Sequence, residues 1–348
     1  MNKRGLKMEN RDKKILQEAI EIFQKTTDLD VDYQINHYRD LGRPDGEIRI
    51  IHQNLELFFE IEVKLRITPA TIGIVTQELL NYRDKGILIT RYATPQIAEL
   101  LKEMDIPFID TAGNAYINKP PLFIYITGNK PVKGPHKEPL QRAFKPSGLR
   151  VVFALLCIPG MENRPFREIA KAANVALGTV GWVVRDLKMM GYIVDMGRRG
   201  RKLVRKDNLL KRWVTAYPEQ LRPREQKGRF RAMENDWWKN IEIKNHNAYW
   251  GGEVAAAILT NYLKPATVTI YTNKPIGKLL LKNKLKRVHE GNIEIFNVFW
   301  GFKHNWYYDD IVHPILIYAD LLATGDIRNI ETARMIYEKE LTRFVRED

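Results

Sequence analysis

The stretch NVALGTVGWVVRDLKMMGYIV, residues 174–194, contains the pattern that decides the fold of the middle of this chain. Its apolar side chains recur every three or four residues, which is the spacing of the buried stripe of one helix. These side chains are Val180, Val183, Val184 and Leu187. The pattern predicts a helix over about 177–190 that follows a short turn at 174–176.

Two helices are predicted before this one and a hairpin after it. Ser147 can cap a helix that begins at Gly148, and Pro165 can open a second helix that runs to Ala173. Beyond the third helix, residues 192–194 and 203–204 can pair around the basic turn 197–202. This order is typical of a winged helix-turn-helix over 147–218, although a plain helical bundle with a solvated basic loop has the same pattern.

The side chains outside the valine stripe are candidates for contact with double-stranded DNA. Recognition helices read the major groove with residues near their N-terminal half. We therefore expect Thr179 and Trp182 to contact base edges, although Trp182 could equally belong to the core. Arg185 and Lys188 are expected at phosphates. The predicted wing supplies four further phosphate contacts, namely Arg198, Arg199, Arg201 and Lys202.

The net charge of the chain is concentrated in the same region. Residues 136–235 contain 22 Lys and Arg against 9 Asp and Glu, out of a net charge of +14 for the whole chain. The segments on either side are close to neutral. A basic excess around a groove-reading motif indicates nucleic-acid binding, so double-stranded DNA is the predicted partner.

The fold class expected for the whole chain is α/β multidomain. The segment 130–146 is rich in Pro, Gly and Lys and is predicted to be a linker after an α/β domain at 1–129. A C-terminal α+β domain of unknown role is expected over 219–348. A second basic segment, 222–231, contains Pro and Gly and is expected to be a partly ordered arm rather than a helix.

Composition favours a cytoplasmic protein without a membrane partner. The only cysteine, Cys157, lies in an apolar run, which excludes a disulfide framework and suits a reducing compartment. The first 14 residues are charged, and no apolar run approaches the roughly 18 residues needed to cross a bilayer. Regulators commonly bind palindromic DNA as dimers, so a homodimer is a reasonable expectation.

The stretch 57–66 predicts a strand with one buried and one polar face, because apolar and polar side chains alternate along it. Glu62-Val63-Lys64 lies on this strand, and sixteen residues separate it from Pro44-Asp45. This arrangement resembles the PD-(D/E)XK nuclease family. The resemblance implies a restriction-endonuclease-like core in which Asp45 and Glu62 bind Mg²⁺ or Mn²⁺ and Lys64 positions the attacking water. Glu-x-Lys also occurs on ordinary solvated strands, and residues 1–135 carry no net positive charge to attract DNA.

Three further stretches are distinctive: FIDTAGNAYI at 108–117, the Glu62–Gly73 segment and YADLLATGD at 318–326. Together they are similar to the transcriptional regulators that resemble AbiEi antitoxins of type IV toxin-antitoxin systems. The resemblance implies a regulator that represses its own operon and neutralises a nucleotidyltransferase-type toxin without a stable complex. In that family the winged helix is usually N-terminal, whereas here another domain precedes it.

Three functions follow from these observations. The leading one is a sequence-specific DNA-binding regulator, which needs no cofactor. The alternative is a Mg²⁺- or Mn²⁺-dependent DNA endonuclease that uses Asp45, Glu62 and Lys64 and is targeted by the winged helix. The third is a non-catalytic scaffold whose basic surface binds RNA. His and acidic residues beyond residue 236 fit no known metal motif.

Overall fold

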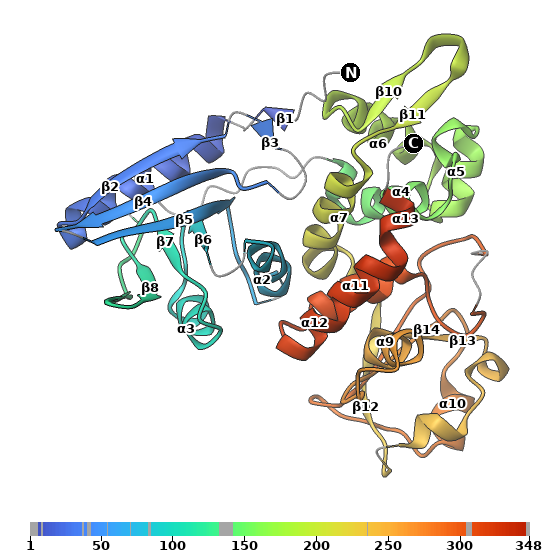
Figure 1. Ribbon diagram of the computed structural model, residues 1–348. Coiled ribbons are helices and arrows are strands. Elements are labelled where there is room, and N and C mark those ends of the chain that lie inside the picture. Colours follow the sequence, from blue (N-terminus) through green and yellow to red (C-terminus); the bar gives the residue numbers. More distant parts are fainter. Residues whose placement is uncertain are drawn as a thin grey trace. The chain divides into compact units, whose positions relative to one another are not determined.

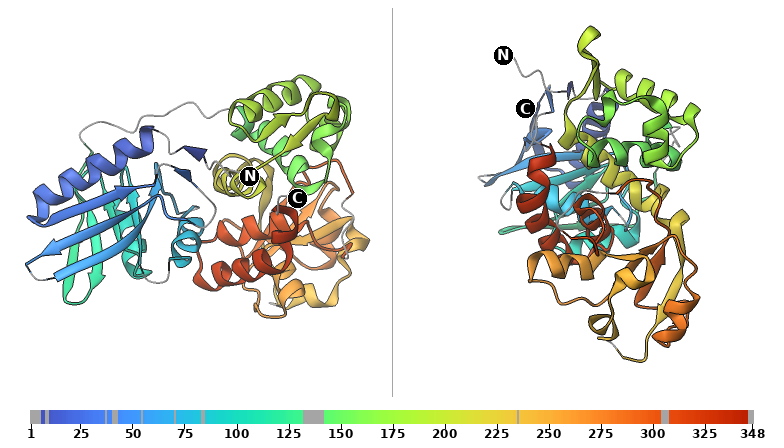
Figure 2. Two further views of the ribbon diagram at one scale, coloured as in Figure 1. Left: turned by 45° about the horizontal axis from the view of Figure 1, so that its top comes forward. Right: turned by 90° about the vertical axis from the view of Figure 1, so that its right-hand side faces the viewer.

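The computed structural model describes residues 6–7, 10–36, 38–39, 43–53, 55–69, 71–82, 85–131, 142–234, 236–303 and 308–345. The chain is a mixed α/β protein that divides into two compact units, Met1–Glu138 and Pro139–Asp348 (Figures 1 and 2). Their boundary falls in the predicted linker, where 132–141 lie outside the described residues. The second unit contains both 147–218 and 219–348, whose division into two domains stays a prediction.

The first unit is built on a seven-stranded sheet with the strand order β2-β4-β5-β6-β7-β8-β9. The pairs β5-β6 and β6-β7 are parallel, and the remaining pairs are antiparallel. The strands are β2 (Asp30–Ile35), β4 (Gly46–His52), β5 (Leu55–Lys64), β6 (Gly86–Thr90), β7 (Phe108–Asp110), β8 (Ala115–Lys119) and β9 (Leu122–Ile126). A separate pair joins β1 (Leu6–Lys7) to β3 (Tyr38–Arg39).

Helices cover both faces of this sheet. Helix α1 (Asn10–Thr27) packs on one face, and α2 (Ile72–Leu80) and α3 (Pro95–Glu103) pack on the other (Figure 2). The predicted alternation along β5 is confirmed, because its apolar side chains lie in the core with α1. Glu62 and Lys64 therefore point to the face that carries α2. The prediction of a nuclease-like fold rests on this order of elements and stays a prediction.

The second unit begins with three helices and a hairpin, in the order that the sequence predicts. The elements are α4 (Pro146–Cys157), α5 (Phe166–Ala173), α6 (Leu177–Met189), β10 (Ile193–Asp195) and β11 (Arg201–Leu203). The predicted Ser147 cap is wrong, because α4 starts at Pro146, two residues before the predicted start at Gly148, and Lys145 occupies the cap position. The valine stripe of α6 is fully buried against α4 and α5, as its spacing predicts.

The rest of the second unit is a five-stranded sheet with helices on one side, in the strand order β13-β14-β16-β12-β15. The strands are β12 (Gln226–Arg231), β13 (Ala248–Gly251), β14 (Val268–Thr272), β15 (Lys286–Arg287) and β16 (Ile293–Phe296). The helices are α7 (Lys206–Gln220), α8 (Arg222–Glu225), α9 (Gly252–Thr260), α10 (Gly277–Lys282), α11 (Pro314–Leu322), α12 (Ile327–Ile336) and α13 (Thr342–Val345), with a π-helical turn at Tyr337–Leu341.

The prediction of a partly ordered arm over 222–231 is wrong. Residues Arg222–Glu225 form the short helix α8, and Gln226–Arg231 form β12, which pairs with β16 on one side and β15 on the other. Pro223 stands in the first turn of α8, where its missing N–H costs no hydrogen bond. Gly228 lies where the register between β12 and β16 shifts, which is a position that glycine accommodates.

Candidate nucleic-acid interface

Helix α6 buries one stripe and leaves its outer face in solvent. Trp182 is 48% exposed, so the interpretation of this side chain as core is wrong. The Arg142 guanidinium lies 4.1 Å from the centre of the indole ring, and that of Arg185 lies 5.7 Å from it. Arg185 is exposed beside Trp182. A large flat side chain with two cations next to it is suited to contact with bases and phosphates.

An ion pair joins the C-terminal part of α6 to the hairpin. Lys188 Nζ lies 2.8 Å from Asp195 Oδ2 at the end of β10, and the Gly197 amide donates to Asp195 Oδ1. The hydrogen bond from Lys188 holds the pKa of the Asp195 carboxyl below its usual value. Lys188 is exposed but paired, so its first role in the free protein is to orient the hairpin relative to α6.

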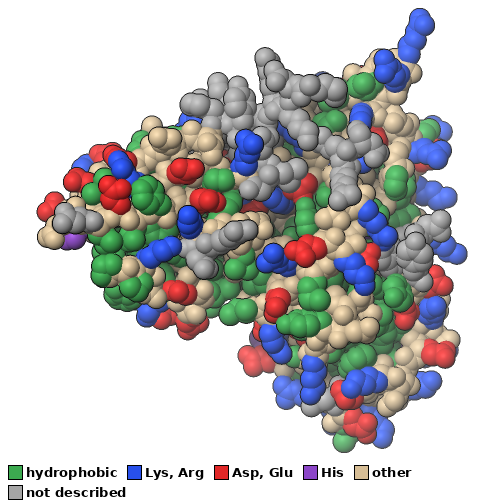
Figure 3. All heavy atoms as spheres, viewed as in Figure 1, with side chains coloured by type: hydrophobic (Ala, Val, Ile, Leu, Met, Phe, Trp, Pro, Cys, Tyr) green, Lys and Arg blue, Asp and Glu red, His purple; other side chains and the backbone are tan. Residues whose placement is uncertain are grey.

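The four basic residues of the predicted wing fall into two groups. Arg198, Arg199 and Lys202 are exposed, and Figure 3 shows Lys and Arg side chains at the tip of the β10–β11 hairpin. Arg201 is half-buried: its amide donates to Asn163 Oδ1 at 2.6 Å, and its guanidinium donates to the Arg164 carbonyl at 3.0 Å. Arg201 thus anchors the hairpin, while the other three are presented to solvent.

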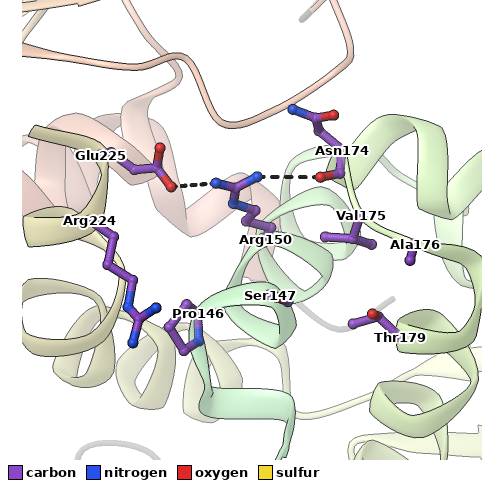
Figure 4. Close-up of a pocket in the computed structure, with 9 residues that line it drawn as sticks. All are labelled: Pro146, Ser147, Arg150, Asn174, Val175, Ala176, Thr179, Arg224 and Glu225. Atoms are coloured by element: carbon purple, nitrogen blue, oxygen red, sulfur yellow. Dashed lines mark hydrogen bonds and ion pairs between the residues drawn. The ribbon is translucent and has the colours of Figure 1, made fainter. Parts of the chain in front are cut away.

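Thr179 lies on the flank of α6 and lines a pocket of about 400 Å³ (Figure 4). The pocket opens between the start of α4, the turn before α6, and α8. Its remaining lining residues are Pro146, Ser147, Arg150, Asn174, Val175, Ala176, Arg224 and Glu225. Thr179, which is predicted to contact a base, therefore lines a concave, partly polar pocket and does not lie on the outermost face of α6.

Helix α8 connects this pocket to the C-terminal sheet. Glu225 accepts from Arg150 at 2.5 Å, and Arg150 in turn donates to the carbonyl of Asn174 in the turn before α6 (Figure 4). From the same short helix, Arg222 pairs with Asp320 of α11 at 3.1 Å and with Glu294 of β16 at 2.6 Å. The position of α6 is thus coupled through the short helix α8 to the core of the C-terminal sheet.

A second cluster of ionisable side chains lies in the first unit. Asp45 is buried, and its Oδ2 accepts from the Val63 amide at 2.9 Å. Glu62 on β5 accepts from the Tyr82 hydroxyl at 2.9 Å, and its Oε1 lies 2.8 Å from Lys64 Nζ. The three residues Asp45, Glu62 and Lys64 therefore lie at one end of the β4–β5 pair, which is the arrangement that the resemblance to the nuclease family implies.

Glu78 of α2 completes this cluster and is missing from the predicted site. Its Oε2 lies 2.5 Å from Lys64 Nζ. Burial of the amine opposes its charge, but the carboxylates of Glu62 and Glu78 outweigh this effect and raise the pKa of Lys64 above its usual value. Burial and the neighbouring Glu62 also raise the pKa of Tyr82. Glu78 precedes Tyr82 by one helical turn, but no signal in the sequence indicates that it contacts Lys64 on β5.

The cluster has two carboxylates, Asp45 and Glu62, in the positions expected for metal ligands. Within the described ranges, no group of three or more His, Cys, Asp and Glu side chains is placed so that it could hold a metal ion. The hard oxygen donors match the preference of Mg²⁺, although backbone carbonyls or substrate oxygens would have to complete the coordination. None of the helices in the described part of the chain combines the length and apolar character needed to span a bilayer.

Comparison with known proteins gives one match. The search of curated proteins and the search of solved structures find none. The match is to a family model and covers residues 202–342. This segment begins in β11 and includes α7 and the C-terminal sheet with its helices, and it does not include α4–α6 or any part of the first unit. The YADLLATGD stretch lies inside it, whereas the FIDTAGNAYI stretch does not. Residues 202–342 match the family described as transcriptional regulator, AbiEi antitoxin, of type IV toxin-antitoxin systems.

Proposed function

We propose that this protein is a sequence-specific DNA-binding transcriptional regulator of the type IV antitoxin kind, which represses its own operon. The observation that carries the proposal is the succession of α4, α5, α6 and a basic hairpin, joined directly to the segment that matches the antitoxin family. This succession is the one expected for a winged helix-turn-helix, and the matched segment is similar to proteins described as transcriptional regulators.

In this proposal α6 enters the major groove with its outer face. Trp182 contacts base edges, and Arg185 contacts the adjoining phosphates. Thr179, which its sequence position places at base edges, contacts the backbone from the flank of the helix. The hairpin follows the next stretch of backbone with Arg198, Arg199 and Lys202. Arg201 and Lys188 support this arrangement through their contacts with Arg164 and Asp195.

Salt-dependent binding of a duplex from the region upstream of the protein's own gene tests the proposal. Replacing Arg198, Arg199 and Lys202 by Gln should lower the slope of log K against log salt by up to about 2.7, or about 0.9 for each phosphate that the variant no longer neutralises. A matched variant replaces three exposed lysines of the C-terminal sheet region, Lys278, Lys282 and Lys284, by Gln. An equal change of slope in both variants would contradict a specific role for the hairpin.

Two partners belong to the same proposal. A homodimer would present two copies of α6 to a palindromic site, and a nucleotidyltransferase-type toxin would act in the same operon without forming a stable complex. Light scattering with and without operator DNA tests the dimer. Co-expression with the neighbouring gene product tests the toxin: the antitoxin should restore growth, and no complex should persist on purification.

A second candidate, a Mg²⁺- or Mn²⁺-dependent DNA endonuclease, is favoured by one specific observation. Asp45, Glu62 and Lys64 converge at one end of the β4–β5 pair. In such an enzyme the two carboxylates would hold the cation, and the protonated Lys64 would stabilise charge on the cleaved phosphodiester. Incubation of supercoiled DNA with and without Mg²⁺ or Mn²⁺ tests it. Cleavage that is lost in both Glu62→Ala and Lys64→Ala would establish this activity, and its absence from the wild type would exclude it.

A further inference from the structure

We propose that the pocket between α4, the turn before α6 and α8 binds a phosphate group of the DNA backbone. The inference rests on the proposed DNA-binding function and adds a contact outside both α6 and the hairpin. Its central residue is Arg224, which belongs to the segment 222–231 and not to the winged-helix pattern.

The charge that lines the pocket favours an anion. Two guanidinium groups, Arg150 and Arg224, and a single carboxylate, Glu225, face it. Arg150 lies 2.5 Å from Glu225 and neutralises it. Arg224 is exposed and makes no ion pair with any residue that the structure describes. The pocket therefore keeps one cation without a partner in the described part of the chain, and a phosphate oxygen is the group that an arginine fork binds best.

Further hydrogen-bond donors stand around this cation. The hydroxyls of Ser147 and Thr179 line the same pocket, and in Figure 4 Thr179 lies across the start of α4 from Arg224. Guanidinium and hydroxyl donors around an open volume of about 400 Å³ suit a tetrahedral anion rather than an apolar ligand.

The pocket also lies beside the proposed groove-reading helix. Thr179 joins the pocket to α6, one helical turn before Trp182, so a backbone phosphate in the pocket would lie beside the groove that α6 reads. Arg224 is next to Glu225, whose contact with Arg150 holds the turn before α6. A phosphate bound at Arg224 would therefore fix the depth and the angle at which α6 enters the groove, with the C-terminal sheet as the support.

The test compares Arg224→Gln with Lys278→Gln, which removes one exposed charge at α10. Binding is measured across a salt series on the upstream duplex, and on duplexes in which single phosphates are replaced by neutral methylphosphonates. We expect Arg224→Gln to weaken binding about tenfold and to lower the salt slope by about 0.9, with no change in thermal unfolding. One methylphosphonate position should weaken the wild type and leave Arg224→Gln unaffected. Lys278→Gln should behave like the wild type.

Three outcomes would overturn the inference, and each differs from failure of the proposed function. The first is that Arg224→Gln binds every duplex as the wild type does. The second is that it responds to every methylphosphonate as the wild type does, which would mean that no single phosphate meets Arg224. The third is that calorimetry detects inorganic phosphate in the pocket of the wild type while DNA affinity is unchanged in the variant, which would assign the pocket to a free phosphate compound. If the wild type binds no duplex DNA, the proposed function itself fails.

Discussion

Asp320 is predicted to be the residue whose loss most destabilises the second unit. Its carboxylate is buried and accepts from Tyr271 at 2.8 Å, from Tyr217 at 3.1 Å and from Arg222 at 3.1 Å. These three partners come from β14, α7 and α8. Burial raises the pKa of Asp320, while Arg222 and the two hydroxyls act in the opposite direction. The carboxylate thus joins α11, which contains Asp320, to β14, α7 and α8 by hydrogen bonds.

The size of the effect follows from what each substitution leaves behind. Asp320→Ala leaves the Arg222 charge with Glu294 as its remaining ion-pair partner, and it leaves the Tyr217 and Tyr271 hydroxyls bonded only to each other. Breaking a buried pair costs about 3–5 kcal/mol, and because Glu294 remains we expect about 4 kcal/mol including the hydrogen bonds that are removed. Asp320→Asn keeps an acceptor and should cost about 2 kcal/mol. Tyr217→Phe removes one hydroxyl and should cost about 1 kcal/mol.

Tryptophan fluorescence isolates the relevant transition. All seven tryptophans lie after residue 139, so their emission reports on the second unit alone. Urea unfolding followed in this way should rank the three variants Asp320→Ala, Asp320→Asn and Tyr217→Phe in order of decreasing loss of stability. A loss below about 1 kcal/mol for Asp320→Ala, or equal losses for all three, would refute the assignment of Asp320 as the central buried anion.

Three other predictions concern single side chains. Arg201→Gln should lower the stability of the second unit by about 1 kcal/mol, because it removes the contact with the Arg164 carbonyl, whereas Arg199→Gln should leave the tryptophan-detected midpoint unchanged. Lys64→Ala leaves Glu62 and Glu78 side by side, so their folded-state pKa values should rise. The loss of unfolding free energy in this variant should then be small at pH 4 and grow as the pH rises toward 8. Far-UV circular dichroism of the full chain measures it in the transition that tryptophan fluorescence does not report. A loss independent of pH would contradict the ion-pair assignment. Trp182→Phe should abolish most of the fluorescence quenching that duplex DNA causes, and undiminished quenching would place Trp182 away from the DNA.

Regular periodicity made much of the fold predictable. The valine stripe of α6 and the alternation along β5 depend only on which side chains are buried, and both are found as expected. The hairpin is found where it was predicted, but its turn is shorter: Asp195 pairs with Arg201, so Arg201 and Lys202 belong to β11 and not to the turn. The proximity of Asp45 to Glu62 and Lys64 was expected from the family resemblance alone, and the β4–β5 pairing, which sets Gly46 opposite Ile61, is its structural cause.

Contacts between distant segments could not be predicted. Nothing in the local sequence around Glu78 indicates a partner on β5, fourteen residues earlier in the chain. The basic segment 222–231 has the Pro and Gly content of an irregular arm. In the structure, however, the Arg222 side chain is largely buried because it donates a hydrogen bond to Asp320, almost a hundred residues later. Arg201 looks in sequence like its exposed neighbours, and only the fold gives it Asn163 as an acceptor.

The central claim is that α6 reads DNA sequence, and one measurement tests it most directly. A competition between the upstream duplex and an unrelated duplex of equal length, at physiological salt, measures the preference of the wild type and of Trp182→Ala. We predict that the wild type prefers its own duplex by about a thousandfold or more, and that Trp182→Ala loses about 1–3 kcal/mol of that preference. Equal affinity of the wild type for both duplexes would contradict this claim.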